Sequence, residues 1–292
     1  MLEGVIIKGI GGFYYVMTRK GVFECRARGI FRERNLVPLI GDRVLIRMRE
    51  EGGAGYIEEI LDRKSHLTRP PVANATQVII VVSIKKPDIN YWLLDRFIIM
   101  AEHENLKIKI CLNKIDLVDE NDMNYITDTY TKANYGVIRT STITGEGIVG
   151  LKRILKDNIT VFAGPSGVGK SSLINSINPK LNLETGEVSK KTTRGKHTTR
   201  HVELINLDVN SYVVDTPGFS SLDIGFIERD TELAEYFTEI YSYGHRCKFV
   251  GCLHHKEPDC EVKLQVENGN ISNTRYENYI NFLKEIQNIR RY

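Results

Sequence analysis

Long apolar runs are absent from this 292-residue sequence, and no stretch of about 18 apolar residues is present to form a membrane-spanning helix. The start, MLEGVIIKGIGG, lacks the basic lead and apolar core of a secretory signal, so we expect a cytoplasmic protein without a membrane partner. Cysteine is scarce: there are five, an odd number, and Cys25 and Cys111 are isolated in the sequence. This usage argues against a disulfide framework and indicates a reducing compartment.

A strong excess of charge is also lacking. The net charge is only +3, although residues 1–69 carry 13 Lys/Arg against 9 Asp/Glu and the remaining residues are close to neutral. The basic N-terminal segment is compatible with a weak nucleic-acid footprint. An ordinary solvated surface explains the same excess more simply.

Residues 1–68 contain five short β-rich runs separated by glycines or charged turns. The runs are 4–10, 13–19, 21–28, 42–49 and 55–61. Five strands in so short a segment predict a small closed barrel, and the five-stranded oligonucleotide-binding (OB) barrel is the commonest candidate. An SH3-like barrel with an ordinary charged exterior is the alternative. The side chains that would suit an RNA-binding face are Arg26, Arg28, Arg32, Arg34, Arg43, Arg47 and Arg49, with Tyr14, Tyr15 and Phe31 nearby.

Residues 69–222 alternate between strands and helices. They begin with the paired prolines of residues 69–74, which we interpret as an inter-domain linker. Residues 77–84 are a continuous apolar run, typical of a parallel strand buried on both faces. Further strands are expected at 107–112, 136–141, 159–164, 202–207 and 211–216, and helices at 91–104, 119–133, 147–156 and 170–177. The alternation predicts a doubly wound α/β domain with a mainly parallel sheet.

A phosphate-binding loop is indicated by GPSGVGKS at residues 164–171, which matches G-x-x-x-x-G-K-[ST] between an expected strand and an expected helix. Its glycines let backbone N–H groups surround a phosphate, and the helix N-terminus adds partial positive charge. Lys170 is then placed to reach the β- and γ-phosphates, and Ser171 to ligate Mg²⁺. The residues expected at the phosphates are Gly164, Pro165, Ser166, Gly167, Val168, Gly169, Lys170, Ser171 and Ser172.

The identity of the nucleotide base is indicated by NKID at residues 113–116, directly after an expected buried strand. Guanine presents an N1–H and a 2-amino group side by side, and the Asp116 carboxylate can accept from both. Adenine lacks this donor pair, so Asp116 would stay unpaired, and such rejection can reach ~10⁴. We expect Asn113 to hold the loop and contact the base, and the Lys114 stem to cover one face of the ring.

Two shorter motifs complete a GTPase site. DTPG, at residues 215–218, follows an expected strand; Asp215 would hold Mg²⁺ through a water and the Gly218 N–H would contact the γ-phosphate. The stretch TSTITGEG, at 140–147, fits the loop that supports guanine from the far side, with Ser141 as the expected contact.

The order of these motifs is reversed, because the base-recognition motif precedes the phosphate loop. Rotating the order of the motifs restores that of ordinary GTPases. Domain termini often lie close together, so a circular permutation preserves the site while the chain ends move. The sequence therefore predicts a circularly permuted GTPase domain.

Residues 223–292 are predicted to be a helical, zinc-binding domain, with amphipathic helices at 230–241 and 274–291. Between them, Cys247, Cys252, His254 and Cys260 form C-x₄-C-x-H-x₅-C. Three thiolates and an imidazole at this spacing suit one tetrahedral, structural Zn²⁺. His245 and His255 are alternative fourth ligands.

The sequence resembles the bacterial RsgA family of small ribosomal subunit-dependent GTPases over essentially the whole chain. The features that carry the resemblance are the permuted motif order, GPSGVGKS, RGKHTTRHVEL, DTPGFSS and the Cys/His pattern. The resemblance implies a GTPase that binds the nearly finished small (30S) subunit, contacts its rRNA, and leaves after hydrolysis of GTP to GDP. We also expect a monomer that binds no DNA.

The resemblance further indicates the catalytic residues. Many GTPases place a water-orienting Gln after D-x-x-G, but here that position is Phe219. The family points instead to RGKHTT, where His197 is the candidate for orienting the water, and Thr198 or Thr199 would contact Mg²⁺ and the γ-phosphate. Residues 189–201 carry five Lys/Arg and no acids, which suits an RNA-facing switch.

Two other functions remain open from the sequence. The chain could be a regulatory GTPase whose barrel binds a protein partner. It could also be a nucleic-acid-binding protein whose nucleotide site only senses NTP. RNA-stimulated turnover would distinguish a ribosome-assembly GTPase from a regulatory GTPase with a protein partner. Absence of multiple-turnover phosphate release would favour the nucleic-acid-binding protein that only senses NTP.

Overall fold

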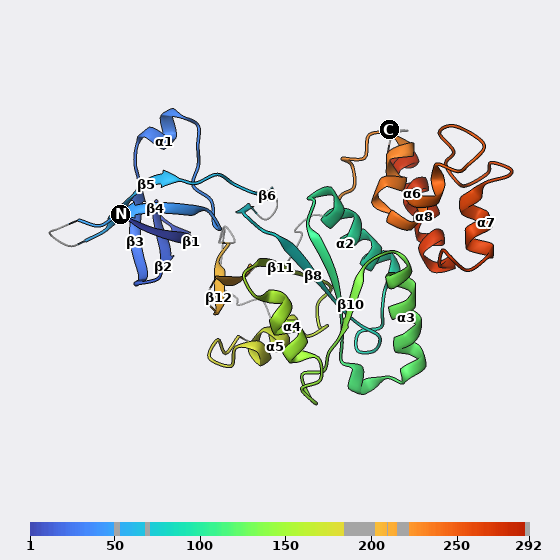
Figure 1. Cartoon of the computed structure of the whole chain (residues 1–292), viewed down its shortest axis with the longest axis horizontal. Coiled ribbons are helices and arrows are strands. Elements are labelled where there is room, and N and C mark those ends of the chain that lie inside the picture. The colour runs from blue at the N-terminus through green and yellow to red at the C-terminus, as the bar shows by residue number, and fades with distance from the viewer. Residues whose placement is uncertain (50–52, 68–70, 184–201, 209, 215–221, 290–292) are drawn as a thin grey trace. The chain divides into compact units, whose positions relative to one another are not determined.

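The computed structural model describes residues 1–49, 53–67, 71–183, 202–208, 210–214 and 222–289 (Figure 1). The chain divides into two compact units. The first unit is Met1–Gln77, Lys152–Phe162 and Ser189–Ser220, and the second is Val78–Leu151, Ala163–Val188 and Ser221–Tyr292. Within the described ranges, no helix combines the length and the apolarity needed to cross a bilayer.

The N-terminal part of the first unit is a closed five-stranded barrel, as the sequence predicts. Its strands are β1 (Leu2–Ile10), β2 (Phe13–Thr18), β3 (Gly21–Ala27), β4 (Arg43–Arg47) and β5 (Gly55–Ile60), in the order β1-β2-β3-β5-β4. A short helix, α1 (Ile30–Glu33), follows β3. Ile6, Val16, Val44 and Ile57 are wholly buried and their neighbours along the strands are less buried, so period-two patterning fills the barrel.

The segment interpreted as a linker is built into the first unit from residue 71 onward. β6 (His66–Leu67) pairs antiparallel with β7 (Val72–Ala73). The Ala73 N–H donates to the Ile40 carbonyl at 2.8 Å, and the Asn74 Nδ2 donates to the Gly41 carbonyl at 3.0 Å. Val72 and Ala73 are fully buried, so hydrophobic burial holds this stretch against the barrel despite its prolines.

The α/β part contains a six-stranded, mainly parallel sheet, in agreement with the sequence. Its order is β10-β9-β8-β11-β13-β12. The strands are β8 (Gln77–Ser83), β9 (Lys107–Asn113), β10 (Gly136–Arg139), β11 (Ile159–Ala163), β12 (Leu204–Asp208) and β13 (Ser211–Val214). β12 is antiparallel to β13, whereas β10–β9 and β11–β13 are parallel. Every residue of β8 and β11 is buried, which explains their continuous apolar sequence.

The helices of the α/β part are α2 (Tyr91–His103), α3 (Glu120–Lys132), α4 (Ile148–Leu155) and α5 (Lys170–Ile177), with a 3-10 turn η1 (Ile115–Leu117). α2 begins where the Asn90 side chain accepts from the Leu93 N–H at 2.9 Å. α3 begins in the same way at Asp119, which accepts from the Asp122 N–H at 3.0 Å. Both caps satisfy N–H groups that a helix start leaves unpaired.

The C-terminal helices differ from the prediction in two respects. The single helix expected at 230–241 is a 3-10 helix, η2 (Asp230–Tyr236), followed by α6 (Thr238–Gly244). Phe237 lies at the break with its ring wholly buried, so packing of this side chain overrides the continuous helical pattern. A helix that the sequence did not reveal, α7 (Glu261–Glu267), precedes the long helix α8 (Asn273–Ile289).

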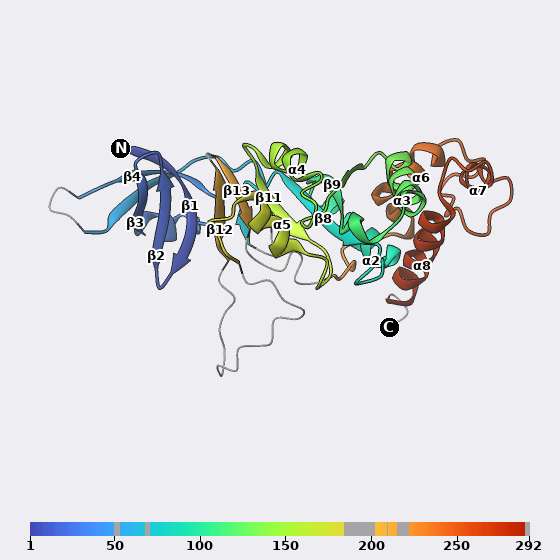
Figure 2. The ribbon, with the colours of Figure 1, turned by 90° about the horizontal axis from the view of Figure 1, so that it is seen from below.

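α2 and the C-terminal helices share one hydrophobic core in the second unit, and α8 lies beside α2 (Figure 1 and Figure 2). Ile99 of α2 packs in this core with residues that follow it by more than a hundred positions. These include Ile224, Ile227, Leu233, Phe237, Ile240, Tyr279, Phe282, Leu283 and Ile286. The C-terminal helices are therefore anchored to the α/β part by apolar burial.

Candidate functional site

The phosphate-loop motif begins directly after β11 and ends in the first turn of α5. At Gly164, which has φ +130°, a Cβ would lie 2.1 Å from the Val81 carbonyl oxygen. At Gly169, which has φ +96°, a Cβ would lie 2.5 Å from the Asn113 Nδ2. Because only glycine tolerates both the positive φ and the close approach, these two motif positions set the curl of the loop.

Lys170 and the two serines after it occupy the first turn of α5. The Lys170 Nζ donates to the Gly164 and Pro165 carbonyls at 2.8 and 2.7 Å, so its ammonium lies inside the curl of the loop. Burial lowers the pKa of Lys170 from its ordinary value. The arrangement puts a cation, Ser171 and Ser172 at one helix N-terminus, a natural place for phosphate.

Asn113 connects the base-recognition motif to the phosphate loop. Its side chain is 1% exposed, and its Nδ2 donates to the Val168 carbonyl at 2.8 Å. Its Oδ1 accepts from the Thr140 hydroxyl at 3.1 Å, and that hydroxyl lies 3.2 Å from the Cys111 sulfur. Burial raises the pKa of Cys111 to about 12, so the group is a thiol that can donate to Thr140.

The chain of hydrogen bonds therefore runs in one direction, from Cys111 through Thr140 and Asn113 to the phosphate loop. Sequence reasoning did not assign a role to Cys111 or to the Thr140 hydroxyl. A signal for Cys111 exists: it lies two residues before Asn113 on the same strand, so both side chains occupy one face.

Lys114 and Asp116 follow Asn113 at the end of β9. Lys114 adopts φ 60°, and its Nζ donates to the Gly167 carbonyl at 2.7 Å and to the Lys86 carbonyl. Asp116 is exposed, and its Oδ1 accepts from the Ser141 hydroxyl at 2.5 Å. Lys114 thus braces the phosphate loop, while Asp116 presents an oriented carboxylate.

Ser141 is fully buried behind Asp116. Its oxygen also accepts from the N–H groups of Ile143 and Thr144 at 3.1 and 3.2 Å. Because both N–H groups point at Ser141 Oγ, the hydroxyl proton is directed to Asp116. The structure therefore places Ser141 where it orients the carboxylate.

The sequence-predicted base and phosphate residues come together in the second unit: Asn113, Lys114, Asp116 and Ser141 with Gly164–Ser172. The other residues predicted for the nucleotide site lie outside the described residues. They are His197, Thr198, Thr199, Asp215 and Gly218.

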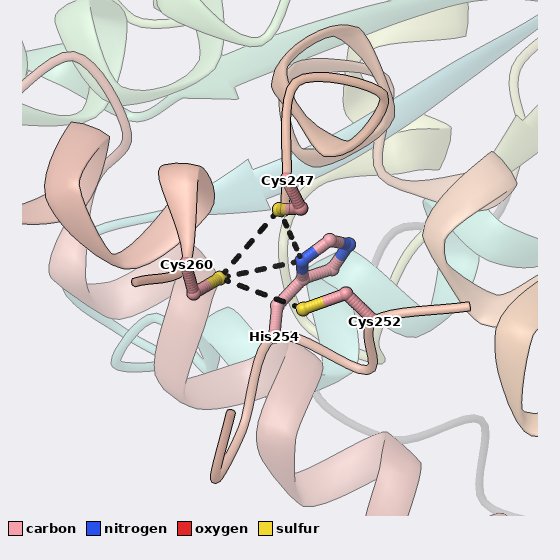
Figure 3. Close-up of side chains that lie close together, drawn as sticks. All are labelled: Cys247, Cys252, His254 and Cys260. Atoms are coloured by element: carbon pink, nitrogen blue, oxygen red, sulfur yellow. Dashed lines mark hydrogen bonds between the residues drawn. The ribbon is translucent and has the colours of Figure 1, made fainter. Parts of the chain in front are cut away.

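A compact metal-ligand cluster lies in the C-terminal part of the second unit. Figure 3 shows the sulfurs of Cys247, Cys252 and Cys260 and the Nδ1 of His254 pointing toward one another. All four ligand atoms lie within 4.8 Å of one another. Cys247 and Cys252 are each 3.8 Å from Cys260 (Sγ···Sγ), and His254 Nδ1 is 3.5 Å from the sulfurs of Cys247 and Cys260.

These separations fit one tetrahedral ion. Zinc bonds of about 2.3 Å to sulfur and about 2.0–2.1 Å to nitrogen require S···S and S···N separations near ~3.8 and ~3.5 Å. Burial lowers the pKa of His254, which favours the neutral imidazole that ligates metals. Of the three candidate histidines, His254 is in the cluster, and His245 and His255 are not.

The loop that carries His254 is held by side chains around it. The Glu257 carboxylate accepts from the N–H groups of Leu253 and His255 at 2.9 and 3.0 Å. The Tyr276 hydroxyl donates to the His254 carbonyl at 2.7 Å. Because these bonds fix the backbone on both sides of His254, they orient the imidazole toward the sulfurs.

These observations define a circularly permuted GTPase with a C-terminal metal module. The base-recognition motif comes before the phosphate loop in the sequence and is bonded to it in the structure. A barrel precedes this GTPase part in the sequence, and a Cys₃His cluster follows it. Two family models match the chain: the RsgA GTPase at residues 60–225 and the RsgA N-terminal domain at residues 3–57. The chain belongs to the RsgA family, and it is a GTP hydrolase.

Individual relatives agree over the full length. The chain is 48% identical to the small ribosomal subunit biogenesis GTPase RsgA of Alkaliphilus metalliredigens over 100% of both chains, and 50% identical to that of Clostridium perfringens over 99% of both. The solved structure of YloQ, a circularly permuted GTPase, matches with a TM-score of 0.81 and 39% identity over 99% of this chain and 96% of that one. YjeQ from Thermotoga maritima matches with a TM-score of 0.82 and 40% identity over 98% of both.

Proposed function

We propose that this GTPase binds the small (30S) ribosomal subunit and its rRNA late in subunit maturation, and that the subunit stimulates hydrolysis, which drives release. The observation that carries the proposal is full-length similarity to proteins named small ribosomal subunit biogenesis GTPase. The partner would place the protein in the cytoplasm, acting as a monomer on RNA rather than DNA.

Guanine selection rests on Asp116, which would accept from the N1–H and 2-amino group of the base. Ser141 supports this role because it fixes one carboxylate oxygen at 2.5 Å. Asn113 and Lys114 would hold the base and the phosphate loop together, since each donates to a loop carbonyl. An ATP molecule would leave the Asp116 acceptors unpaired.

Hydrolysis requires charge stabilisation and an oriented water. Lys170, inside the loop, would stabilise charge on the β- and γ-phosphates, and the loop N–H groups from Gly164 to Ser172 would bind the remaining oxygens. Ser171 and Asp215 would hold Mg²⁺, which neutralises phosphate charge when bound. Gly218, Thr198 and Thr199 would contact the γ-phosphate region, and His197 would orient the water in place of a Gln.

The Cys₃His cluster would hold one structural Zn²⁺. Its donor set and its 3.5 and 3.8 Å separations support this assignment. Four protein ligands would leave no open position for substrate, so the cluster would stabilise the C-terminal helices rather than take part in hydrolysis.

The barrel would contact rRNA through its arginines. One observation favours a second candidate, in which the barrel binds a protein partner: several of these arginines already have acidic neighbours. Arg28 and Arg47 lie 2.5 and 3.4 Å from Glu58 oxygens, and Arg43 pairs with Glu3. Such pairs reduce the positive potential that phosphate binding needs.

The test is GTP turnover of the purified chain with small subunits, large subunits, or naked small-subunit rRNA. We expect stimulation by small subunits above that of the other additions. Equal rates with small subunits, large subunits and buffer would refute the proposal. A further addition, small-subunit proteins free of rRNA, tests the second candidate, which stimulation by these proteins alone would favour.

A further inference from the structure

Arg96 of α2 connects two distant parts of the second unit. Its side chain is nearly buried, and Nη1 and Nη2 donate to the two carboxylate oxygens of Glu285 on α8 at 2.8 Å each. Its Nε donates to the backbone carbonyl of Leu222. The guanidinium lies over the rings of Trp92 and Phe282, 4.8 and 5.8 Å from their centroids. The group therefore binds a helix and a backbone segment at once.

Leu222 is the first described residue after the DTPG stretch, which ends four positions earlier. Ile224 and Ile227 follow it and are buried in the core that contains Leu283 and Ile286 of α8. Within a few residues of DTPG, the chain is thus fixed both by Arg96 and by apolar packing. The acceptor of the Arg96 Nε bond is the carbonyl of Leu222, so Arg96 holds the main chain itself at this exit.

We propose that Arg96 is a positioning residue for GTP hydrolysis: it holds the exit of the DTPG segment against α8, and so couples the nucleotide state to the C-terminal helices. The inference rests on the proposed role of DTPG at the γ-phosphate. Arginine suits this position because its planar fork donates to both oxygens of one carboxylate and, through Nε, to a carbonyl in a fixed geometry, whereas the donors of lysine all lie on one nitrogen and cannot reproduce this fork.

A merely structural role would give a different result, and the chain offers a matched control. Arg63 in the first unit also joins one carboxylate to one backbone carbonyl, through different nitrogens: Nε and Nη2 donate to the Asp42 carboxylate at 2.7 and 2.8 Å, and Nη2 donates to the Val37 carbonyl at 2.7 Å. Arg63→Lys therefore removes an equivalent fork without touching the DTPG exit.

The chain also carries its own reporter. Trp92 is the sole tryptophan, and its ring stacks on Phe282 of α8 with centroids 5.3 Å apart. Because Arg96 lies over the same indole, a shift of the Leu222–Arg96–Glu285 connection changes the surroundings of Trp92. Its emission therefore reports on the coupling without a label.

The experiment compares wild-type protein, Arg96→Lys, Glu285→Ala and Arg63→Lys. For Arg96→Lys we expect kcat to fall by about 10–100-fold, because misplacement by ~1 Å can cost ~10² in rate. We expect KM to stay within about twofold, the pattern of an interaction that matters in the transition state. Trp92 emission should differ between GDP and a non-hydrolysable GTP analogue in wild type and Arg63→Lys, and this difference should be lost in Arg96→Lys and Glu285→Ala.

Two results would overturn the coupling: no nucleotide-dependent change of Trp92 emission in the wild type, or wild-type kcat and emission in Arg96→Lys. If Arg96→Lys fails to fold, Glu285→Ala decides, since it keeps Arg96 and the Leu222 bond but cuts the connection to α8. Binding of a fluorescent guanine nucleotide is measured in parallel. Loss of that binding in the wild type refutes the proposed function, whereas binding without a Trp92 response refutes only the coupling.

Discussion

Arg275 and Asp95 form an ion pair of 2.7 Å although their side chains are only 1% and 0% exposed and lie 180 positions apart in the sequence. Arg275 also donates to both carboxylate oxygens of Glu239, at 2.7 and 3.0 Å. Arg275 on α8 is thus bonded to Asp95 on α2 and to Glu239 on α6, and it joins the three helices inside the second unit. Asp95 further accepts from Asn278 at 2.6 Å and from Tyr130 at 3.0 Å, so each of the buried charged groups is hydrogen-bonded.

Removing Arg275 should destabilise the protein strongly. Arg275→Met leaves Asp95 and Glu239 as buried carboxylates without their cation, and we expect a loss of ~3–5 kcal/mol in the free energy of unfolding. Urea unfolding measures it. Lys248→Met is the control, because the Lys248–Asp259 pair is exposed and should contribute only ~0–1 kcal/mol. Equal effects of the two changes would contradict the importance of burial.

The purified protein should contain one zinc per chain. His254→Ala should release it and unfold the loops around the cluster, because metal binding and local folding are coupled. His245→Ala and His255→Ala should retain the metal, since neither ring is in the cluster. Elemental analysis together with limited proteolysis measures both effects. Protein purified without chelator but free of zinc, or loss of zinc in His255→Ala, would refute the assignment.

Base selection should depend on Asp116. Asp116→Asn replaces an acceptor by a donor beside the guanine N1–H, so GTP affinity should fall by ~10²–10⁴ while xanthosine triphosphate binds better. Ser141→Ala should cost about tenfold, the order of one hydrogen bond to a charged group. Calorimetric titration measures both, with Thr142→Ala as the neighbouring control. ATP competing as well as GTP with the wild type would rule out guanine recognition.

The bonds behind Asn113 should affect nucleotide affinity from a distance. Thr140→Val keeps the volume but removes the hydroxyl that donates to Asn113, so GDP affinity should fall by about 3–10-fold. Cys111→Ser should match the wild type, because a serine hydroxyl can donate to Thr140 in its place. Thr160→Val is the control: its buried hydroxyl accepts from Gln77 at 2.8 Å and does not contact the loop. Equal losses in both threonine variants would mean that general destabilisation is responsible.

Subunit-stimulated turnover should depend on His197, which lies outside the described residues. Phe219 follows DTPG and cannot orient a water, so His197→Ala should reduce stimulated turnover by ~10²–10⁴, the usual range for a positioned proton-transfer group. Nucleotide affinity and GTP-dependent subunit binding should stay near wild type, so the variant remains on the subunit. Wild-type stimulated turnover in His197→Ala, with His201→Ala assayed beside it, would exclude this role.

The sequence alone determined those features that depend on residues close together along the chain. The phosphate loop, NKID and the Cys/His pattern are short, contiguous motifs whose geometry follows from one strand end, one turn or one loop. Glycine at 164 and 169 is required by positive φ and by close contacts that any side chain would violate. Likewise, the barrel strands and the buried strands β8 and β11 follow from period-two and continuous apolar patterns.

Only the tertiary structure decided which residues meet across long sequence separations. It selected His254 over two neighbouring histidines, because ring direction depends on the loop backbone that Glu257 and Tyr276 hold. It broke the helix expected at 230–241, because burial of Phe237 outweighs local periodicity. It also brought Arg275 to Asp95 and Arg96 to Leu222, since hydrophobic packing of α8 on α2 joins segments whose spacing in the sequence carries no signal.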